Sequence, residues 1–216
     1  EISECLVGSE MCIRDRRLRE YQRQGAAGIG EFMICRKINH PFIQAVFHAA
    51  EKLGMPILFH MSPQEGYEYG IVDEPGLPML EEALETYPRL KFIGHSQPFW
   101  HEISQDAKPD LKSRMEWGKG PVKEGGRLVC LMRNYKNLYA DLSANSGGCA
   151  IMRDEKFGLQ FLEEFQDRLM FGTDMVNTDM VFPLGEWLDR QYQEGKLSAQ
   201  AYRKICFENA KKIFQL

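Results

Sequence analysis

Side chains that could bind a metal ion stand at the ends of several predicted strands in this sequence. They are Glu31, His60, His95 and Asp174. The strands are short apolar runs bounded by turn residues, as is typical of core strands in parallel sheets, and they cover residues 27–34, 56–61, 90–95 and 168–171. Because the carboxyl ends of parallel strands meet at one edge of a sheet, we expect these side chains to lie together. Imidazole and carboxylate bind divalent cations, and such a cation produces hydroxide from water at neutral pH.

Each of these residues also has an explanation that involves no metal. A single strand-end histidine is more often a hydrogen-bonded core residue than a ligand, and Glu31 could pair with a nearby basic residue. Asp174 could cap the turn that follows its strand. Asp141, which belongs to a further predicted strand at 137–144, is expected to point away from the site. The occurrence of candidates at the ends of several strands nevertheless favours a shared metal site.

The elements that must position these side chains alternate between strands and amphipathic helices. Predicted helices lie around residues 39–53, 80–87, 128–135, 161–169, 184–188 and 198–213, the first capped by Asn39 and the last by Ser198. Predicted loops cover residues 62–78, 104–126 and 145–148. Short buried strands that alternate with helices predict right-handed βαβ units, and therefore a parallel α/β sheet.

Composition limits the classes of partner. The chain has 216 residues, a net charge of -4 and a pI near 5.8, which argues against nucleic acid or an anionic membrane surface as the main partner. No apolar run reaches the roughly 20 residues of a membrane helix. Six scattered cysteines favour a reducing compartment, so a cytoplasmic location is expected. A small-molecule substrate is the expected partner, and exposed sheet edges would allow a homo-oligomer.

The first residues differ from the rest of the chain. Residues 1–16 (EISECLVGSEMCIRDR) show no helical or strand periodicity, and they resemble the translated read-through of a sequencing-library adapter. We therefore expect residues 1–16 to be non-native and residues 17–216 to form one domain.

Four stretches in this order, PILFHM, LKFIGHSQPFW, NLYADLSA and RLMFGTD, resemble the amidohydrolase superfamily, in particular its metal-dependent hydrolases of the amidohydrolase 2 type. The resemblance implies a TIM-type (β/α)8 barrel, of which this chain would supply the C-terminal portion, about strands 4 to 8, as an open parallel sheet. It implies that His60, His95 and Asp174 bind a divalent metal, expected to be zinc. Glu31 would bridge two ions in a binuclear site.

The resemblance also implies roles in catalysis. Asp174 would accept the proton of the attacking water, and His95 is the second candidate catalytic residue. Residues just beyond the strand ends are candidates for substrate binding, because loops at that face build the cavity of a barrel. These candidates are Arg36, Trp100, His101 and Asn145.

Three readings of the function stay open. The first is a hydrolase of an amide, ester or lactone. The second is a decarboxylase of the aminocarboxymuconate-semialdehyde decarboxylase type, in which His95 would act as acid and base; Thr173-Asp174 followed by Pro183-Leu184-Gly185-Glu186 resembles that branch. The third is an inactive fragment, because no histidine precedes His40 and the family's first-strand His-x-His pair has no counterpart.

Overall fold

The protein is described by a computed structural model that covers residues 16–216. The prediction that residues 1–16 are non-native therefore falls, apart from Arg16, outside the described residues. A helix over residues 16–23 precedes the first strand.

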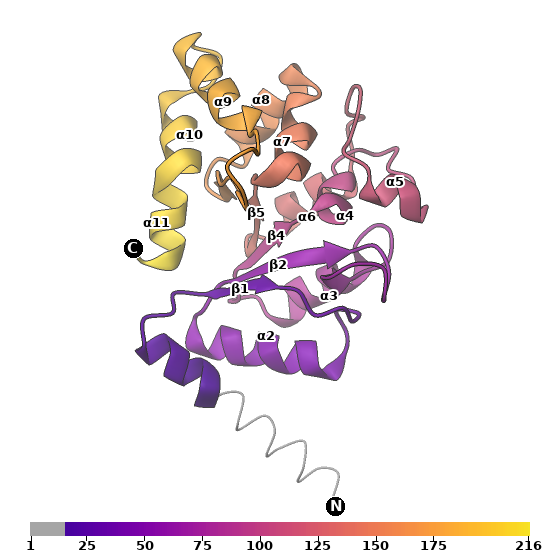
Figure 1. Cartoon of the computed structure of the whole chain (residues 1–216), viewed down its shortest axis with the longest axis vertical. Coiled ribbons are helices and arrows are strands. Elements are labelled where there is room, and N and C mark those ends of the chain that lie inside the picture. Colours follow the sequence, from indigo (N-terminus) through magenta and orange to yellow (C-terminus); the bar gives the residue numbers. More distant parts are fainter. Residues whose placement is uncertain (1–15) are drawn as a thin grey trace, which may run out of the picture.

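A parallel sheet forms the centre of the fold (Figure 1). Its strands follow the order β1-β2-β4-β5-β6 and are β1 (Ile29–Phe32), β2 (Ile57–Ser62), β4 (Phe92–His95), β5 (Leu138–Asp141) and β6 (Leu169–Met170). Each pair of neighbours is parallel. A short strand that the sequence did not predict, β3 (Ile71–Val72), pairs with β2 outside this order. The predicted open parallel α/β sheet is thus confirmed.

Helices connect the strands. They are α2 (Pro41–Leu53), α3 (Pro78–Thr86), α4 (Gln97–His101), α5 (Leu111–Met115), α6 (Arg127–Asn134), α7 (Ala144–Met152), α8 (Glu155–Glu164), α9 (Pro183–Gln193), α10 (Ala199–Arg203) and α11 (Asn209–Phe214), with a π-helical turn at Lys204–Glu208 between the last two. In Figure 1, α2 lies beneath β1 and β2, and the yellow helices α10 and α11 run down the left side.

Two local predictions were wrong. The predicted loop at residues 145–148 is the first part of α7. Its small residues serve packing instead, because a Cβ atom at Gly147 would lie 2.7 Å from the backbone of Leu142. At the start of α2 the N-cap is His40 and not Asn39, since the His40 side chain accepts the Phe42 N–H.

The two faces of the sheet have different neighbours. Phe59, Phe92 and Leu138 point to the face covered by helices and belong to the large hydrophobic core. Ile93 and Met170 point to the opposite face, where they pack with Ile213 of α11. Strand alternation therefore divides the apolar residues between a large core and a small one.

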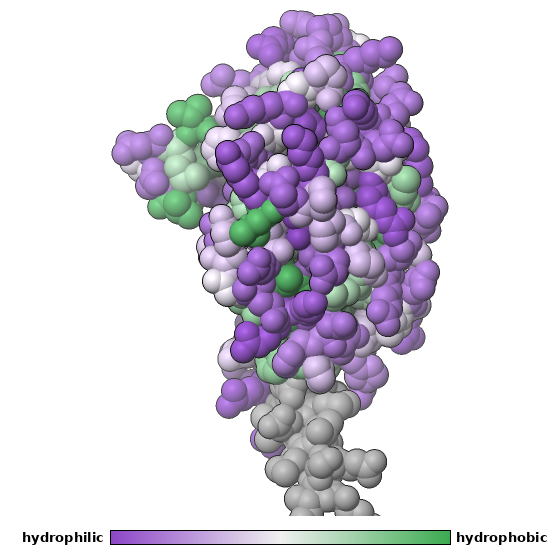
Figure 2. All heavy atoms as spheres, turned by 90° about the vertical axis from the view of Figure 1, so that its right-hand side faces the viewer, coloured by the Kyte–Doolittle hydropathy of each residue, from purple (hydrophilic) through white to green (hydrophobic). Residues whose placement is uncertain are grey.

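One face of the molecule is mainly hydrophilic (Figure 2). On the side of the molecule that carries α5, Figure 2 shows mainly hydrophilic residues with small, separate hydrophobic areas. Within residues 16–216, none of the helices is both long and apolar enough to cross a membrane.

Candidate metal centre

The register of the sheet aligns three polar side chains at the strand ends. His60 of β2 is the register partner of His95 of β4, and Gly94 is the partner of Ala140, so Asp141 of β5 follows beside His95. Alternate residues of a strand share a face. His60, His95 and Asp141 therefore project from the face opposite the large core.

Glu31 of β1 completes the cluster. Its Oε1 atom lies 2.5 Å from His60 Nδ1 and 3.9 Å from His95 Nε2. One potential ligand atom from each of Glu31, His60 and His95 lies within 4.8 Å of the others. The two histidines are only 6% and 4% exposed. The structure thus brings together three of the four predicted metal ligands.

Asp174 lies at the rim of this cluster, in the loop after β6. Its Oδ2 atom is 3.8 Å from His95 Nε2, and its side chain is 44% exposed. The backbone φ of Asp174 is 54°, in the left-handed region that aspartate adopts more readily than most residues. The carboxylate is therefore close to His95 and open to solvent.

The prediction that Asp141 points away from the site was wrong. Its Oδ2 atom lies 2.9 Å from His95 Nδ1, and its Oδ1 atom accepts the backbone N–H of Ser143 at 3.0 Å. The neighbouring Leu142 is the residue that faces the large core. Because adjacent residues of a strand point to opposite faces, Asp141 points to the face that carries the two histidines. The prediction had assigned Asp141 to the other face.

The electrostatic environments of the two histidines differ. Burial lowers the pKa of His60 and outweighs the opposing effect of Glu31. Burial also acts to lower the pKa of His95, but the hydrogen bond and charge of Asp141, with the charges of Glu31 and Asp174, raise it overall. Because a carboxylate only accepts, the Asp141 contact assigns a proton to His95 Nδ1 and leaves Nε2 facing Glu31 and Asp174.

Two supporting residues had not been predicted. Ser96 Oγ donates to the Met61 carbonyl and accepts the Met61 N–H, both at 2.9 Å, which joins β2 and β4 just beyond the two histidines. The ring of Tyr69 lies 4.3 Å from the His60 ring, centroid to centroid. A polar residue directly after His95 was the available signal for Ser96, whereas nothing in the sequence pattern placed Tyr69 against His60.

A cavity of about 470 Å³ opens beside the cluster. Its lining combines Glu31, His95, Asp141 and Asp174 with apolar side chains that include Leu58 and Phe214. A cavity of this size, apolar with a few convergent polar groups, is typical of small-molecule sites.

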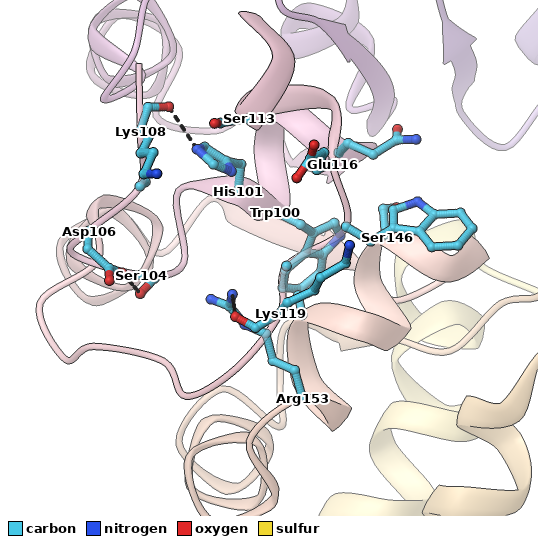
Figure 3. A pocket seen from close by; sticks show the side chains of 15 residues that line it. Trp100, His101, Ser104, Asp106, Lys108, Ser113, Glu116, Lys119, Ser146 and Arg153 are labelled. Atoms are coloured by element: carbon cyan, nitrogen blue, oxygen red, sulfur yellow. Dashed lines mark hydrogen bonds between the residues drawn. The ribbon is translucent and has the colours of Figure 1, made fainter. Parts of the chain in front are cut away.

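The predicted substrate-binding residues lie outside this cavity. Trp100 and His101 line a second cavity, described below (Figure 3). Arg36 is exposed, and its Nη1 atom donates to the Cys35 carbonyl. Asn145 is half-buried in the first turn of α7. Contact of these four residues with a substrate stays a prediction.

The fold is a parallel α/β sheet, and histidine and carboxylate side chains gather at its strand ends, as they do in many metal-dependent enzymes. The sequence profile described as amidohydrolase matches residues 36–216, and the chain belongs to this family. The family is metal-dependent, and its members are hydrolases and decarboxylases. Glu31 precedes the matched segment. No curated protein sequence is similar enough to the chain to count as a match.

Solved structures resemble the fold at low sequence identity. A candidate 2-pyrone-4,6-dicarboxylic acid hydrolase of Pseudomonas putida has a TM-score of 0.54 and 16% identity, over 93% of this chain and 67% of that one. An Agrobacterium tumefaciens protein has a TM-score of 0.48 and 17% identity, over 84% and 60%. A dihydroxybenzoic acid decarboxylase of a Polaromonas species, with bound manganese and 2-nitroresorcinol, has a TM-score of 0.41 and 18% identity, over 83% and 55%. The chain thus spans between about half and two thirds of the length of these proteins.

Proposed function

We propose that the site belongs to a metal-dependent hydrolase that cleaves an amide, ester or lactone bond of a small molecule. The convergence of Glu31, His60 and His95 from three neighbouring strands carries this proposal. Core histidines on separate strands have no need to share a carboxylate, whereas ligands of one ion must converge.

The donor set fits a divalent cation. Two imidazoles and the carboxylates of Glu31 and Asp174 are ligands that zinc and manganese accept, and the hydrogen bond from His95 to Asp141 is the kind of supporting contact that orients a ligating histidine. A cation held there would lower the pKa of a bound water toward about 7.

The residues of the chain divide the remaining tasks. His60 and His95 would hold the cation, and Glu31, whose carboxylate reaches both imidazoles, would be a further ligand. Asp141 fixes the tautomer of His95 so that Nε2 faces the site. Asp174 is exposed at the rim and accepts the proton of the attacking water. The apolar lining of the cavity binds the body of the substrate.

A decarboxylase is the second candidate, and the pairing of His95 with Asp141 favours it. The carboxylate stabilises a protonated imidazole, which could deliver a proton from Nε2 to the carbon that loses CO₂. In that case His95 acts as acid and base and does not bind the metal. The two candidates therefore differ in what His95 contacts.

Metal titration of the full chain tests the site itself. Calorimetric titration with Zn²⁺ and with Mn²⁺ should show binding, and His60→Asn should weaken it by at least about tenfold. His48→Asn is the matched control, because His48 is exposed on α2 and remote from the cluster. Equal affinity in the wild type and His60→Asn would contradict the proposal. An absence of binding would favour an inactive fragment.

The reaction is tested separately with a panel of small esters, lactones and aromatic carboxylic acids. Acid release measured in a pH-stat identifies hydrolysis, and CO₂ evolution identifies decarboxylation. Asp174→Asn should abolish acid release. If His95→Asn abolishes turnover but leaves metal affinity unchanged, the decarboxylase reading replaces the hydrolase.

A further inference from the structure

A second cavity, of about 240 Å³, lies between α4, α5 and α7 (Figure 3). It shares no lining residue with the cavity at the metal centre. Its walls come from α4, from the loops on both sides of α5, from α7 and from Arg153 just after α7. Neither the family match nor the metal centre gives this cavity a role.

The guanidinium of Arg153 lines the cavity with most of its donors unused. Among residues 16–216 its one hydrogen bond runs from Nη1 to the Lys119 carbonyl at 3.4 Å, and its buried Nε has no partner. Gly118 gives the group room, because a Cβ atom there would lie 2.5 Å from Nη1. A partly buried guanidinium with free donors is a strong site for a carboxylate or phosphate.

Ser146 provides a second unpaired polar group in the same wall. The residue is 5% exposed, and its hydroxyl finds no hydrogen-bond partner within the described part of the chain. Leaving a buried hydroxyl without a partner is costly, so a ligand that reaches Ser146 would gain from pairing with it.

The charges around the cavity favour an anion. Asp106 is paired with Lys123 and accepts a hydrogen bond from Ser104, and Glu116 lies 3.9 Å from Lys112. Over residues 16–216, Lys108, Lys119 and Arg153 form no ion pair, which leaves the cations in excess. This excess of positive charge favours an anionic ligand over a neutral one.

Two tryptophans supply the apolar part of the wall. Trp100 is buried, and its indole N–H donates to the Asp141 carbonyl, so the ring is fixed. Trp117 is 47% exposed. Flat aromatic surfaces beside an unpaired guanidinium suit an aromatic ring that carries one carboxylate. At roughly 30 Å³ for each water displaced, the cavity has room for a ligand on the order of ten non-hydrogen atoms.

We infer that this cavity is a binding site for a small aromatic carboxylic acid, held by the Arg153 guanidinium and the Ser146 hydroxyl against Trp100 and Trp117. The site is distinct from the metal centre and does not depend on the reaction proposed there. Trp100 nevertheless links the two, because it donates to the backbone of Asp141, whose carboxylate holds His95.

Calorimetric titration of the full chain with benzoate tests the inference. Benzoate should bind with a dissociation constant on the order of 1 mM or tighter. Arg153→Gln should weaken binding by about 10- to 100-fold, as expected for a charge-assisted hydrogen bond. Arg133→Gln is the matched control, because Arg133 pairs with Glu164 outside the cavity. Benzamide, which has the same shape without the charge, should bind more weakly than benzoate.

Further variants keep the test decisive if Arg153→Gln fails to fold. Trp117→Ala removes an exposed side chain and should fold normally while weakening benzoate binding, and Ser146→Ala should weaken it to a smaller extent. Asp174→Asn, at the metal centre, should leave benzoate binding unchanged. Three results would each overturn the inference: loss of benzoate binding in Asp174→Asn, unweakened binding in Arg153→Gln, or no binding heat at benzoate concentrations up to about 10 times the expected dissociation constant. The inference would also be overturned if the protein bound phosphate but not benzoate and Trp117→Ala left phosphate binding unaltered. That result would indicate a simple anion site.

Discussion

The two faces of the sheet use the same strands for opposite purposes. On the helix-covered face, Phe59, Phe92 and Leu138 are fully buried and exclude water. On the other face, Leu58 and Tyr139 are only partly buried, and a row of histidines and acids borders an open cavity. The strands β2, β4 and β5 thus stabilise the fold with one set of alternate residues and place histidine or aspartate side chains at the cluster with the other.

The difference lies in how polar atoms are satisfied. The members of the large core are hydrophobic side chains, so their contribution to stability comes from apolar area removed from water. At the metal centre Glu31 bonds to His60 and Asp141 to His95, so the polar groups satisfy one another. Changes on the first face should therefore affect stability, and changes on the second should mainly affect binding.

The largest expected effect is on the free energy of unfolding, and it is tested at two adjacent residues of β2 that point to opposite faces of the sheet. Phe59→Ala should lower the free energy of unfolding by about 3–5 kcal/mol, because it leaves a cavity in the large core. Leu58→Ala, on the partly open face, should cost about 1–2 kcal/mol because less area is buried. Urea unfolding of both variants measures the contrast, and equal losses would show that the two faces contribute alike.

A buried acid at the start of α3 should give a pH-dependent effect on stability. Asp73 caps the start of α3 by accepting the N–H groups of Met79 and Leu80, and burial raises its pKa from 3.8 to about 6 in spite of these bonds and Arg114. Between these values the folded state binds more protons than the unfolded state, so this contribution to stability is present at low pH and lost as the pH rises through 6.

The variant Asp73→Asn isolates this contribution from that of other acids. The difference in unfolding free energy between wild type and Asp73→Asn should fall by about 2–3 kcal/mol between pH 4 and pH 7. Urea unfolding at the two pH values checks it. A difference that stays constant or rises with pH would falsify the raised pKa.

On the site face, the expected effect is on metal affinity. Asp141→Asn keeps the shape of the carboxylate but removes the charge that holds His95, so Zn²⁺ affinity should fall by about 10- to 100-fold. Calorimetric titration measures the change. Asp189→Asn serves as the control, since Asp189 accepts from Tyr202 far from the cluster in the chain's C-terminal helices. Unchanged affinity in Asp141→Asn would show that His95 needs no such partner.

Much of this organisation could be predicted from the sequence, because strand periodicity and strand-end chemistry are local. Runs such as residues 56–61 and 90–95 indicated buried strands, and histidine at the end of each indicated a shared site. The class of the fold follows from their alternation with helices. By contrast, the side of the sheet to which Asp141 points depends on which of its neighbours packs into the core. That neighbour is Leu142, and its burial results from tertiary packing.

Other features could not be predicted because they depend on long-range contacts. The glycines of α7 have the composition of a loop, and the close approach of Gly147 to Leu142 appears only when helix and strand are packed. Trp100 follows a strand end, as substrate-binding residues often do, yet α4 turns it toward the second cavity. Local pattern predicts which end of a strand carries chemistry, and packing decides which cavity receives each side chain.

The smallest expected effect concerns Ser96, whose hydroxyl joins the two strands that carry His60 and His95. Its two hydrogen bonds to the Met61 backbone hold β4 to β2 next to His60 and His95, so Ser96→Ala leaves a buried N–H and a carbonyl without that partner. We expect a loss of about 1–2 kcal/mol in the free energy of unfolding, since each neutral hydrogen bond contributes about 1 kcal/mol net. Metal affinity should also fall, because the two imidazoles lose their fixed spacing. Ser96→Thr, which keeps the hydroxyl, should restore both properties in part. If Ser96→Ala lowers stability but leaves Zn²⁺ affinity unaltered, the spacing of the histidines is set by strand pairing alone, and Ser96 belongs to the core rather than to the site.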